Sequence, residues 1–498
     1  MSGFLLFLTF PDFDLFPLAW VAMVPLLYFL FDLDGKKVFK AGFYFGVVYF
    51  FGTTYWIYHS MNKYGSIPLI PSFLLVLLLC LYLSLFPALF AYLYRSFTRR
   101  SDMPSLFVAP VLWTTLEFLR SYALTGFPWS SLGYSQYLFL PLIQVADITG
   151  VYGISFLIVA VNGAIVDALL LKRKHKEKPL ASFLPTYGGF ALLGLSLVVV
   201  LSYGFYRMYQ PRDGHNVKVA VIQGNVEQDK KWDPAYQESV VSTFQQLSVS
   251  AAGEAPQLIV WPETSLPFYF GKNKELTERF ISFQRQLNSY LLFGSVLFRH
   301  SDTASGYTNS ALLLDKNGII TYSYDKIHLV PFGEYIPLKR VLFFLETLGA
   351  GVGDYIPGES YRKAVTPFGS FGTLICYEIV FPGLVRKFYA KGGDFIVTIT
   401  NDAWFGKTFG PYQHFSMAVF RAIENRKPVV RAANTGISGF IDSNGRILGK
   451  TELFKRTYMV RDIKTDTTLS RYTKYGDIFS YLNIICVLLM IVGKKKDR

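Results

Sequence analysis

Three apolar runs in the second half of the chain each lead into a side chain that could take part in catalysis. The run LIVWPE ends at Glu263, YSYDKIHLVPFGEY carries Lys326 and Glu334, and TLICYE carries Cys376. Sites in α/β folds gather where strands end. A nucleophilic cysteine needs a base to form the thiolate and a cation or amide donors to stabilise the oxyanion. A glutamate, a lysine and a cysteine supply those parts without a histidine.

Each of these residues alone has an ordinary structural explanation. A cysteine after an apolar run is more often a small core residue, and a glutamate or lysine in a polar stretch usually faces solvent. The combination of the three types favours catalysis. Of the three cysteines, Cys80 and Cys486 lie inside apolar runs, so Cys376 is the one in a soluble part of the chain. No pair suggests a disulfide framework.

Neither a cofactor nor a nucleic acid is predicted. The six histidines show no HExxH or paired metal spacing, and no motif asks for a metal or a nucleotide. The net charge of +14 invites a nucleic-acid interpretation. However, the positive charge sits in short loops beside apolar segments, the pattern of an integral membrane protein. These basic segments are 36–37, 95–100, 172–178 and 494–498.

Long apolar segments predict a membrane bundle that holds these catalytic residues at a bilayer. The chain has 498 residues and is 51% hydrophobic, and about 20 apolar residues cross a bilayer as a helix. Residues 3–10 are too short to cross alone, so we predict seven or eight spans. The candidate spans are about 15–32, 41–61, 67–95, 104–121, 140–171, 188–209 and 477–493.

The basic segments predict one orientation of the bundle. With 36–37 in the cytoplasm, counting helices forward places the other three basic segments there too. The loops 62–66 and 122–138 and the whole segment 210–476 then fall outside. The catalytic candidates therefore lie on the outer side.

Two features of the bundle invite a functional reading. Glu117 and Arg120 are three residues apart in an apolar segment, so they share a helix face near its outer end. They are either a structural ion pair or a functional intramembrane charge pair. The loop LTGFPWSSLGYSQY (124–137) is either an interfacial aromatic belt or a lipid-facing arm beside an active site.

Short β-rich runs separated by amphipathic stretches predict layered α/β packing in the outer segment. The expected strands are 217–225, 258–264, 290–297, 310–315, 371–380, 395–402 and 429–442. The expected helices are 235–251, 274–288 and 411–426.

Several motifs carry a family resemblance. WPET around Glu263, DKIHLVPFGEYIP around Lys326 and ICYEI around Cys376 resemble the three catalytic blocks of the nitrilase superfamily. Within it, further motifs in this order resemble the apolipoprotein N-acyltransferases, and the likeness extends over nearly the whole chain. These motifs are LTGFPWSSLGYSQ (124–136), NDAWFG (401–406), GPYQHF (410–415) and RAIENRKPVVRAANTGISGFID (421–442).

The resemblance implies a fold and a place in the cell. It implies a multi-span α-helical membrane bundle plus an extracytoplasmic nitrilase-like α-β-β-α sandwich. Residues 1–209 would form membrane helices one to seven, 210–470 the catalytic domain, and 471–498 the last membrane helix and a basic cytoplasmic tail. The protein would lie in a bacterial inner membrane with its catalytic domain in the periplasm. The first apolar segment is much shorter than the family's first helix.

The resemblance also implies residue roles. Cys376 would be the nucleophile, Glu263 the general base and Lys326 the oxyanion stabiliser, with Glu334 orienting Lys326 or Cys376. Tyr377 and Glu378 flank the nucleophile, and Trp232, in KKWDP, matches a tryptophan that the family places near its substrate. Further supporting residues would be Trp404 and Phe405, with Trp232 and Phe405 as candidates for an apolar cover over the thioester.

The implied reaction is a two-step acyl transfer in ping-pong order. A phospholipid gives its acyl chain to the enzyme, and the amino group of a diacylglyceryl-cysteine apolipoprotein then takes it. Two other active classes stay open. A membrane-tethered nitrilase-like amidase would use the same three residues with water as acceptor. A transporter would place its charges at mid-depth along a path. A catalytically inactive scaffold is disfavoured because all three catalytic positions are filled.

Overall fold

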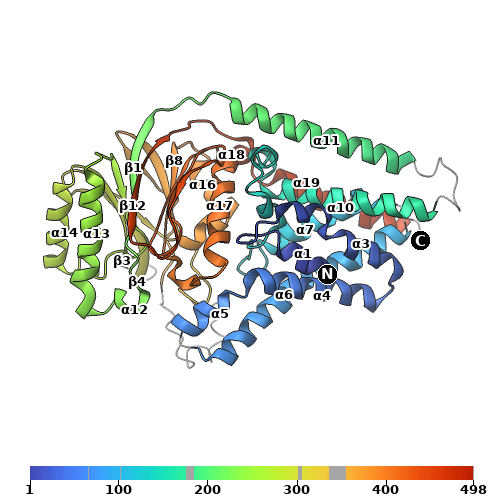
Figure 1. The fold of residues 1–498 in the computed structure, drawn as a ribbon, viewed down its shortest axis with the longest axis horizontal. Coiled ribbons are helices and arrows are strands. Elements are labelled where there is room, and N and C mark those ends of the chain that lie inside the picture. Colours follow the sequence, from blue (N-terminus) through green and yellow to red (C-terminus); the bar gives the residue numbers. More distant parts are fainter. Residues whose placement is uncertain (66, 101–102, 175–183, 301–304, 336–354, 497–498) are drawn as a thin grey trace. The chain divides into compact units, whose positions relative to one another are not determined.

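The chain forms two compact units. The computed structural model describes residues 1–65, 67–100, 103–174, 184–300, 305–335 and 355–496. The first unit comprises Met1–Tyr58, Leu69–Gln210 and Tyr475–Arg498, and the second comprises His59–Pro68 and Pro211–Lys474. Figure 1 labels the elements of both units.

The described residues of the first unit form helices and connecting loops, with no strand among them. Three of its helices, α6, α10 and α11, are long and apolar enough to cross a membrane, over Leu69–Arg99, Val151–Leu171 and Leu184–Tyr209. The longer helices are α4 (Lys36–Thr54), α6 (Leu69–Arg100), α7 (Ser105–Arg120), α10 (Val151–Lys174), α11 (Leu184–Tyr209) and α19 (Ile478–Lys496). The short ones are α1 (Ser2–Phe7), η1 (Phe16–Leu18), α2 (Ala19–Ala22), α3 (Val24–Phe29), η2 (Leu30–Asp32), η4 (Leu132–Gln136), α8 (Leu140–Ile143) and α9 (Ala146–Thr149).

Three of the predicted spans are not single continuous helices. In 41–61, α4 ends at Thr54 and a separate short helix, α5 (Ile57–His59), follows. The segment 140–171 contains α8, α9 and α10, and Gly150 at φ 63° separates the last two. A helix cannot run through a residue with positive φ. The segment 15–32 consists of four short helices, with Pro17 in the first turn of η1. Seven or eight spans therefore stay a prediction. The basic segment 172–178 lies outside the described residues from position 175 onward.

Glu117 and Arg120 hold the loop that follows their helix. Arg120 donates hydrogen bonds to the carbonyl oxygens of Phe127 and Trp129 at 3.1 and 2.7 Å. The Glu117 carboxylate accepts from the Leu132 amide at 2.7 Å. Within the loop, Trp129 is 1% exposed, so this residue does not fit either alternative, the interfacial aromatic belt or the lipid-facing arm. Buried backbone carbonyls need donors, and Arg120 satisfies two of them.

The second unit is built on two six-stranded sheets. The strand order is β12-β1-β2-β3-β4-β5 in one sheet and β11-β10-β9-β8-β7-β6 in the other. The first sheet contains β1 (Asn216–Gln223), β2 (Leu258–Val260), β3 (Tyr290–His300), β4 (Ser305–Leu314), β5 (Ile320–Asp325) and β12 (Thr457–Lys464). The second contains β6 (Lys363–Thr366), β7 (Gly369–Ile375), β8 (Phe395–Thr400), β9 (Val429–Ala433), β10 (Gly439–Ile441) and β11 (Ile447–Lys450).

Helices cover the outer faces of the two sheets. Helices α13 (Gln237–Ala252) and α14 (Lys274–Gln286) lie outside the first sheet, and α16 (Pro382–Tyr389) and α17 (Gly410–Asn425) lie outside the second (Figure 1). This is the predicted α-β-β-α sandwich. Every expected strand and helix is present, although 371–380 ends as the 3-10 helix η7 (Cys376–Val380). Strands β5, β6, β11 and β12 and helix α16 lie outside the expected ranges.

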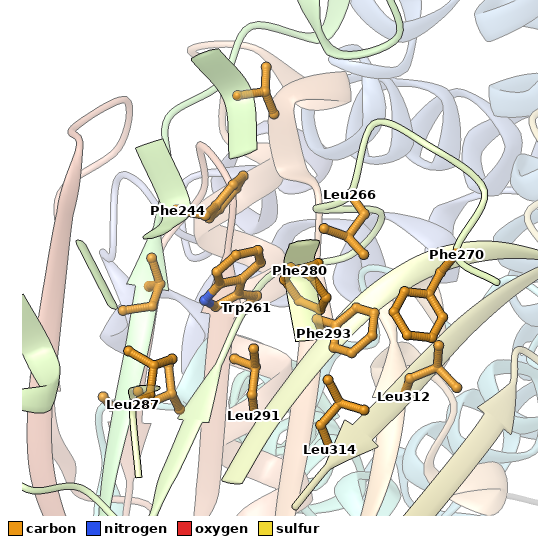
Figure 2. Packing of buried hydrophobic residues seen from close by; sticks show 14 of the residues in the cluster. Phe244, Trp261, Leu266, Phe270, Phe280, Leu287, Leu291, Phe293, Leu312 and Leu314 are labelled. Atoms are coloured by element: carbon orange, nitrogen blue, oxygen red, sulfur yellow. The ribbon is translucent and has the colours of Figure 1, made fainter. Parts of the chain in front are cut away.

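An aromatic core fixes the first sheet to its helices. Figure 2 shows Phe244, Trp261, Phe280 and Phe293 packed together between α13, α14 and the strands. The rings of Phe244 and Trp261 are stacked at 5.0 Å, and those of Phe280 and Phe293 meet at 4.9 Å. Aromatic pairs add to the stability that comes from buried area. Because Trp261 directly follows β2, this core holds the chain two residues before Glu263.

Candidate active site

Glu263 lies in a tight turn after β2. The turn packs on β3 so closely that a Cβ at Gly294 would lie 2.4 Å from the Thr264 nitrogen. Only glycine leaves that space, and Thr264 itself takes a left-handed conformation at φ 43°. The Glu263 carboxylate accepts hydrogen bonds from the backbone N–H of Asn401 at 2.9 Å and from the side-chain Nδ2 of Asn309 at 2.7 Å. Two donors from different sheets therefore fix the orientation of this carboxylate.

Lys326 follows β5 and is buried between two carboxylates. Its Nζ lies 2.8 Å from Glu334 Oε2 and 3.7 Å from Glu263 Oε1. Burial alone would lower the pKa of Lys326, but the carboxylates of Glu334 and Glu263 raise it well above its usual range. These contacts favour the charged ammonium at neutral pH. Glu334 also accepts from the Val330 amide at 2.8 Å, so it holds Lys326 in place.

Cys376 stands at the sharp turn between β7 and η7. Its φ of 52° is left-handed, a strained conformation for a residue with a side chain. It is 8% exposed. Burial, followed by the nearby Glu263 carboxylate, raises the pKa of the Cys376 thiol, and Lys326 opposes this rise. These effects together favour the neutral thiol, and Glu263 and Lys326 are both close enough to act on its charge.

Asn309 belongs to this site although the sequence did not indicate it. Its Nδ2 donates to Glu263 Oε1 at 2.7 Å and to Glu334 Oε1 at 2.8 Å. Its backbone carbonyl accepts from the Lys326 amide at 2.8 Å. One residue of β4 thus touches all three charged members. In YTNSALLLD it stands between a threonine and a serine, so its local sequence gives no signal of this role.

Glu378 is buried away from solvent and joins the segment of Lys326 to the turn of Cys376. Its carboxylate accepts from the Ile327 amide at 2.8 Å, the Tyr324 hydroxyl at 2.6 Å and the Ile375 amide at 2.8 Å. These donors lie on both sheets. Glu378 therefore fixes the distance between two catalytic candidates. Tyr377 is half-buried and packs edge-on against Phe381 at 4.9 Å.

A second buried lysine, Lys231, also lies at the site. It is 2% exposed and donates to the Glu263 carbonyl oxygen at 3.1 Å, with a further short contact to the Thr264 hydroxyl. Burial lowers the pKa of Lys231 to about 8, although the negative charge of Glu263 opposes this shift. Lys231 holds the left-handed turn that aims Glu263.

The three predicted aromatic residues lie on neighbouring aromatic groups. Trp232 is 39% exposed and lies 5.9 Å from Tyr269. Trp404 meets the ring of Tyr64 edge-on at 5.2 Å. Phe405 meets the ring of His414 edge-on at 5.7 Å. The cover over the Cys376 thioester stays a prediction.

Lys231 gives a pH-dependent prediction. Between pH about 8 and about 10, the unfolded chain still binds the lysine proton whereas the folded protein does not. The free energy of unfolding should therefore rise with pH in this window for the wild type relative to Lys231→Met. Urea unfolding of both proteins in detergent at several pH values measures the difference. Parallel pH profiles for the two proteins would contradict the assignment.

Comparison with known proteins covers nearly the whole chain. A family model described as the apolipoprotein N-acyltransferase N-terminal domain matches residues 2–164, and one described as carbon-nitrogen hydrolase matches residues 218–472. The protein named apolipoprotein N-acyltransferase from Geobacter metallireducens is 43% identical over 484 residues, which are 97% of this chain and 91% of the relative. The one from Haemophilus ducreyi is 34% identical over 500 residues, 99% of this chain and 95% of the relative. A solved carbon-nitrogen hydrolase from Helicobacter pylori aligns with 50% of this chain and 89% of its own, at 17% identity and a TM-score of 0.39.

Proposed function

The chain belongs to the apolipoprotein N-acyltransferase family, and on that premise we propose that it acylates lipoproteins through a thioester on Cys376. The donor is a phospholipid, and the acceptor is the N-terminal amine of a diacylglyceryl-cysteine apolipoprotein. One observation carries the proposal: a buried lysine touches two carboxylates, at 2.8 and 3.7 Å, beside a buried thiol at a strained strand end. Such a group of a base, a cation and a nucleophile suits acyl transfer.

The first half-reaction makes the thioester. Cys376 Sγ attacks the ester carbonyl carbon of the phospholipid while Glu263 takes the thiol proton. Lys326 faces the oxygen that becomes negative in the tetrahedral intermediate. The carbon–oxygen ester bond then breaks, and the lysophospholipid alkoxide leaves with the proton held by Glu263. The fixed positive charge of Lys326 costs no reorganisation at the moment of attack.

The second half-reaction transfers the acyl chain to nitrogen. The amine of the apolipoprotein attacks the thioester carbonyl carbon, a carbon–nitrogen bond forms, and the carbon–sulfur bond breaks. Glu263 takes one amine proton and returns it to the Cys376 sulfur. One thiol serves both halves, so the lysophospholipid must leave before the amine attacks.

The proposed mechanism predicts a covalent acyl-enzyme intermediate and ping-pong steady-state kinetics. Intact mass spectrometry after incubation with phospholipid should show an acyl adduct on the Cys376 peptide that hydroxylamine removes. Initial rates at several concentrations of donor and acceptor should give parallel double-reciprocal lines, as in ping-pong catalysis. Intersecting lines would mean a ternary complex. If the acyl adduct disappears at the same rate with and without a lipopeptide amine, water is the acceptor. That result would indicate an amidase instead.

We also propose that the second unit lies on the periplasmic side of a bacterial inner membrane. The helices of the first unit that can cross a bilayer and the basic segments beside apolar runs support this orientation. Single cysteines introduced near residues 36 and 98 should be shielded from a membrane-impermeant maleimide in intact spheroplasts. Cysteines near residues 64, 130 and 300 should react. A shielded residue 300 would place the catalytic unit on the wrong side for its acceptor.

A further inference from the structure

Three residues that the proposed reaction does not use meet under the nucleophile. Asp402, His414 and Arg431 come from η8 (Asp402–Phe405), α17 and β9, and each is at most 1% exposed. His414 Nδ1 lies 3.0 Å from Asp402 Oδ1, and Arg431 Nη2 lies 2.8 Å from Asp402 Oδ2. The other ring nitrogen, Nε2, lies 3.2 Å from the carbonyl oxygen of Cys376.

The contact with Cys376 fixes the proton on one nitrogen of the ring. A carbonyl oxygen only accepts hydrogen bonds, so His414 Nε2 must carry the hydrogen. Nδ1 then either accepts from Arg431 Nη2, 3.0 Å away, or donates to Asp402. Burial, followed by Arg431, lowers the pKa of His414, which favours the first arrangement. The donor to Cys376 is present in both.

The neighbouring carboxylate stays charged. Burial would raise the pKa of Asp402, but the positive charge of Arg431 holds it well below its usual range. A buried ion pair of this kind keeps its geometry because either partner alone would be an uncompensated charge. Asp402 and Arg431 therefore hold the ring of His414 against the turn of the nucleophile.

The hydrogen bond from His414 to the Cys376 carbonyl fixes the orientation of the whole Cys376–Tyr377 peptide group. The Cys376 carbonyl and the Tyr377 N–H belong to one planar trans peptide, so they point in opposite directions. Tyr377 is the second residue of η7, and the first amides of a helix have no partner within it. An amide directly after a nucleophile at a strand-to-helix turn can donate to the oxyanion.

We propose that His414, held by Asp402 and Arg431, is a positioning residue that fixes the Cys376–Tyr377 peptide so that the Tyr377 N–H stabilises the oxyanion together with Lys326. Donation to the carbonyl also polarises the peptide, which makes its N–H a better donor. The inference rests on the proposed function, since it needs an acyl oxyanion on Cys376.

Two matched variants test this role. Methionine and glutamine have nearly the same shape, but only glutamine can donate to the Cys376 carbonyl. His414→Met and His414→Gln are made with Cys80→Ala and Cys486→Ala, so that Cys376 is the sole thiol. Two rates are measured for each: single-turnover acyl loading from phospholipid, and methylthiolation of Cys376 by methyl methanethiosulfonate, which forms no oxyanion.

Loading by His414→Met should fall by about 10- to 100-fold, the size expected for a misplaced reacting group. Methylthiolation should stay within about twofold, because it depends on the thiol alone. His414→Gln should recover most of the loading rate. If His414→Met does not fold, His414→Phe, which keeps a ring, replaces it with the same expectations.

Three results would overturn the inference. They are wild-type loading by the variant without a donor, an equal fall of both rates, and loading by His414→Gln that is no better than by His414→Met. A different result would contradict the proposed function itself. A parent protein that is methylthiolated normally but never loads an acyl chain would exclude the thioester itself.

Discussion

Replacing Cys376 by alanine should abolish both acyl loading and transfer to the apolipoprotein amine. The thiol is the proposed site of the covalent bond, and removing the nucleophile of a comparable catalytic group costs on the order of 10⁶ in rate. The substitution removes one sulfur atom and keeps the buried hydrogen bond from His414 to the Cys376 carbonyl. The fold should therefore survive. Loading is read by intact mass, and transfer by N-acylation of a diacylated lipopeptide.

The other two cysteines are the matched controls. Cys80 is buried in α6, and Cys486 is exposed on α19, both in the helical unit. Cys80→Ala and Cys486→Ala should keep near-normal loading and transfer. Cys376→Ser should trap little ester, because a hydroxyl is a poorer nucleophile with the same base. Normal turnover by Cys376→Ala would exclude the covalent mechanism.

Glu263 and Cys376 could be predicted as catalytic candidates because the end of a buried strand is visible in the sequence pattern. Strand β2 is apolar and buried throughout, and β7 ends in the buried apolar residues Leu374 and Ile375, so the first side chain beyond each strand that could do chemistry stands out. Glu263 and Cys376 both occupy such positions. The strand ends alone do not predict that these two residues meet, because β2 lies in the first sheet and β7 in the second. The packing of the two sheets brings them together.

Lys231 and Asn309 could not be found in this way. Lys230 and Lys231 are adjacent and of one type, yet Lys230 pairs with Glu227 near solvent whereas Lys231 is buried against Glu263. No feature of the neighbouring sequence distinguishes the exposed lysine from the buried one. Asn309 becomes a catalytic neighbour only because β3, β4 and β5 pair as they do, which brings Lys326 beside it. Such roles depend on contacts between distant parts of the chain.

Hydropathy alone does not predict where the helices of the first unit are interrupted. An apolar average over 140–171 does not register that Gly150 turns the chain between two helices. The glycines, serines and aromatic residues of the loop 124–137 indicated either an interfacial aromatic belt or a lipid-facing arm. Two carbonyls of that loop accept from Arg120, which allows the backbone around Trp129 to be buried. A single buried cation thus allows part of this loop to be buried.

Lys326→Met should reduce single-turnover acyl loading by about 10²- to 10³-fold, the usual cost of losing one oxyanion donor. It should also destabilise the protein. Glu263 and Glu334 would be left as buried carboxylates without their shared cation, and breaking a buried pair in this way costs about 3–5 kcal/mol. Loss of activity alone would therefore not separate catalysis from folding.

The double variant Lys326→Met/Glu334→Gln separates the two effects. It removes the cation together with one of its two anions, so less uncompensated charge stays buried. Asn309 Nδ2 can still donate to the carbonyl oxygen of the new amide and to Glu263, as it does to both carboxylates now. The urea midpoint should recover toward that of the wild type while acyl loading stays as slow as in Lys326→Met. If loading recovers together with stability, Lys326 only neutralises its neighbours, and the oxyanion must be stabilised by backbone amides at the turn of Cys376.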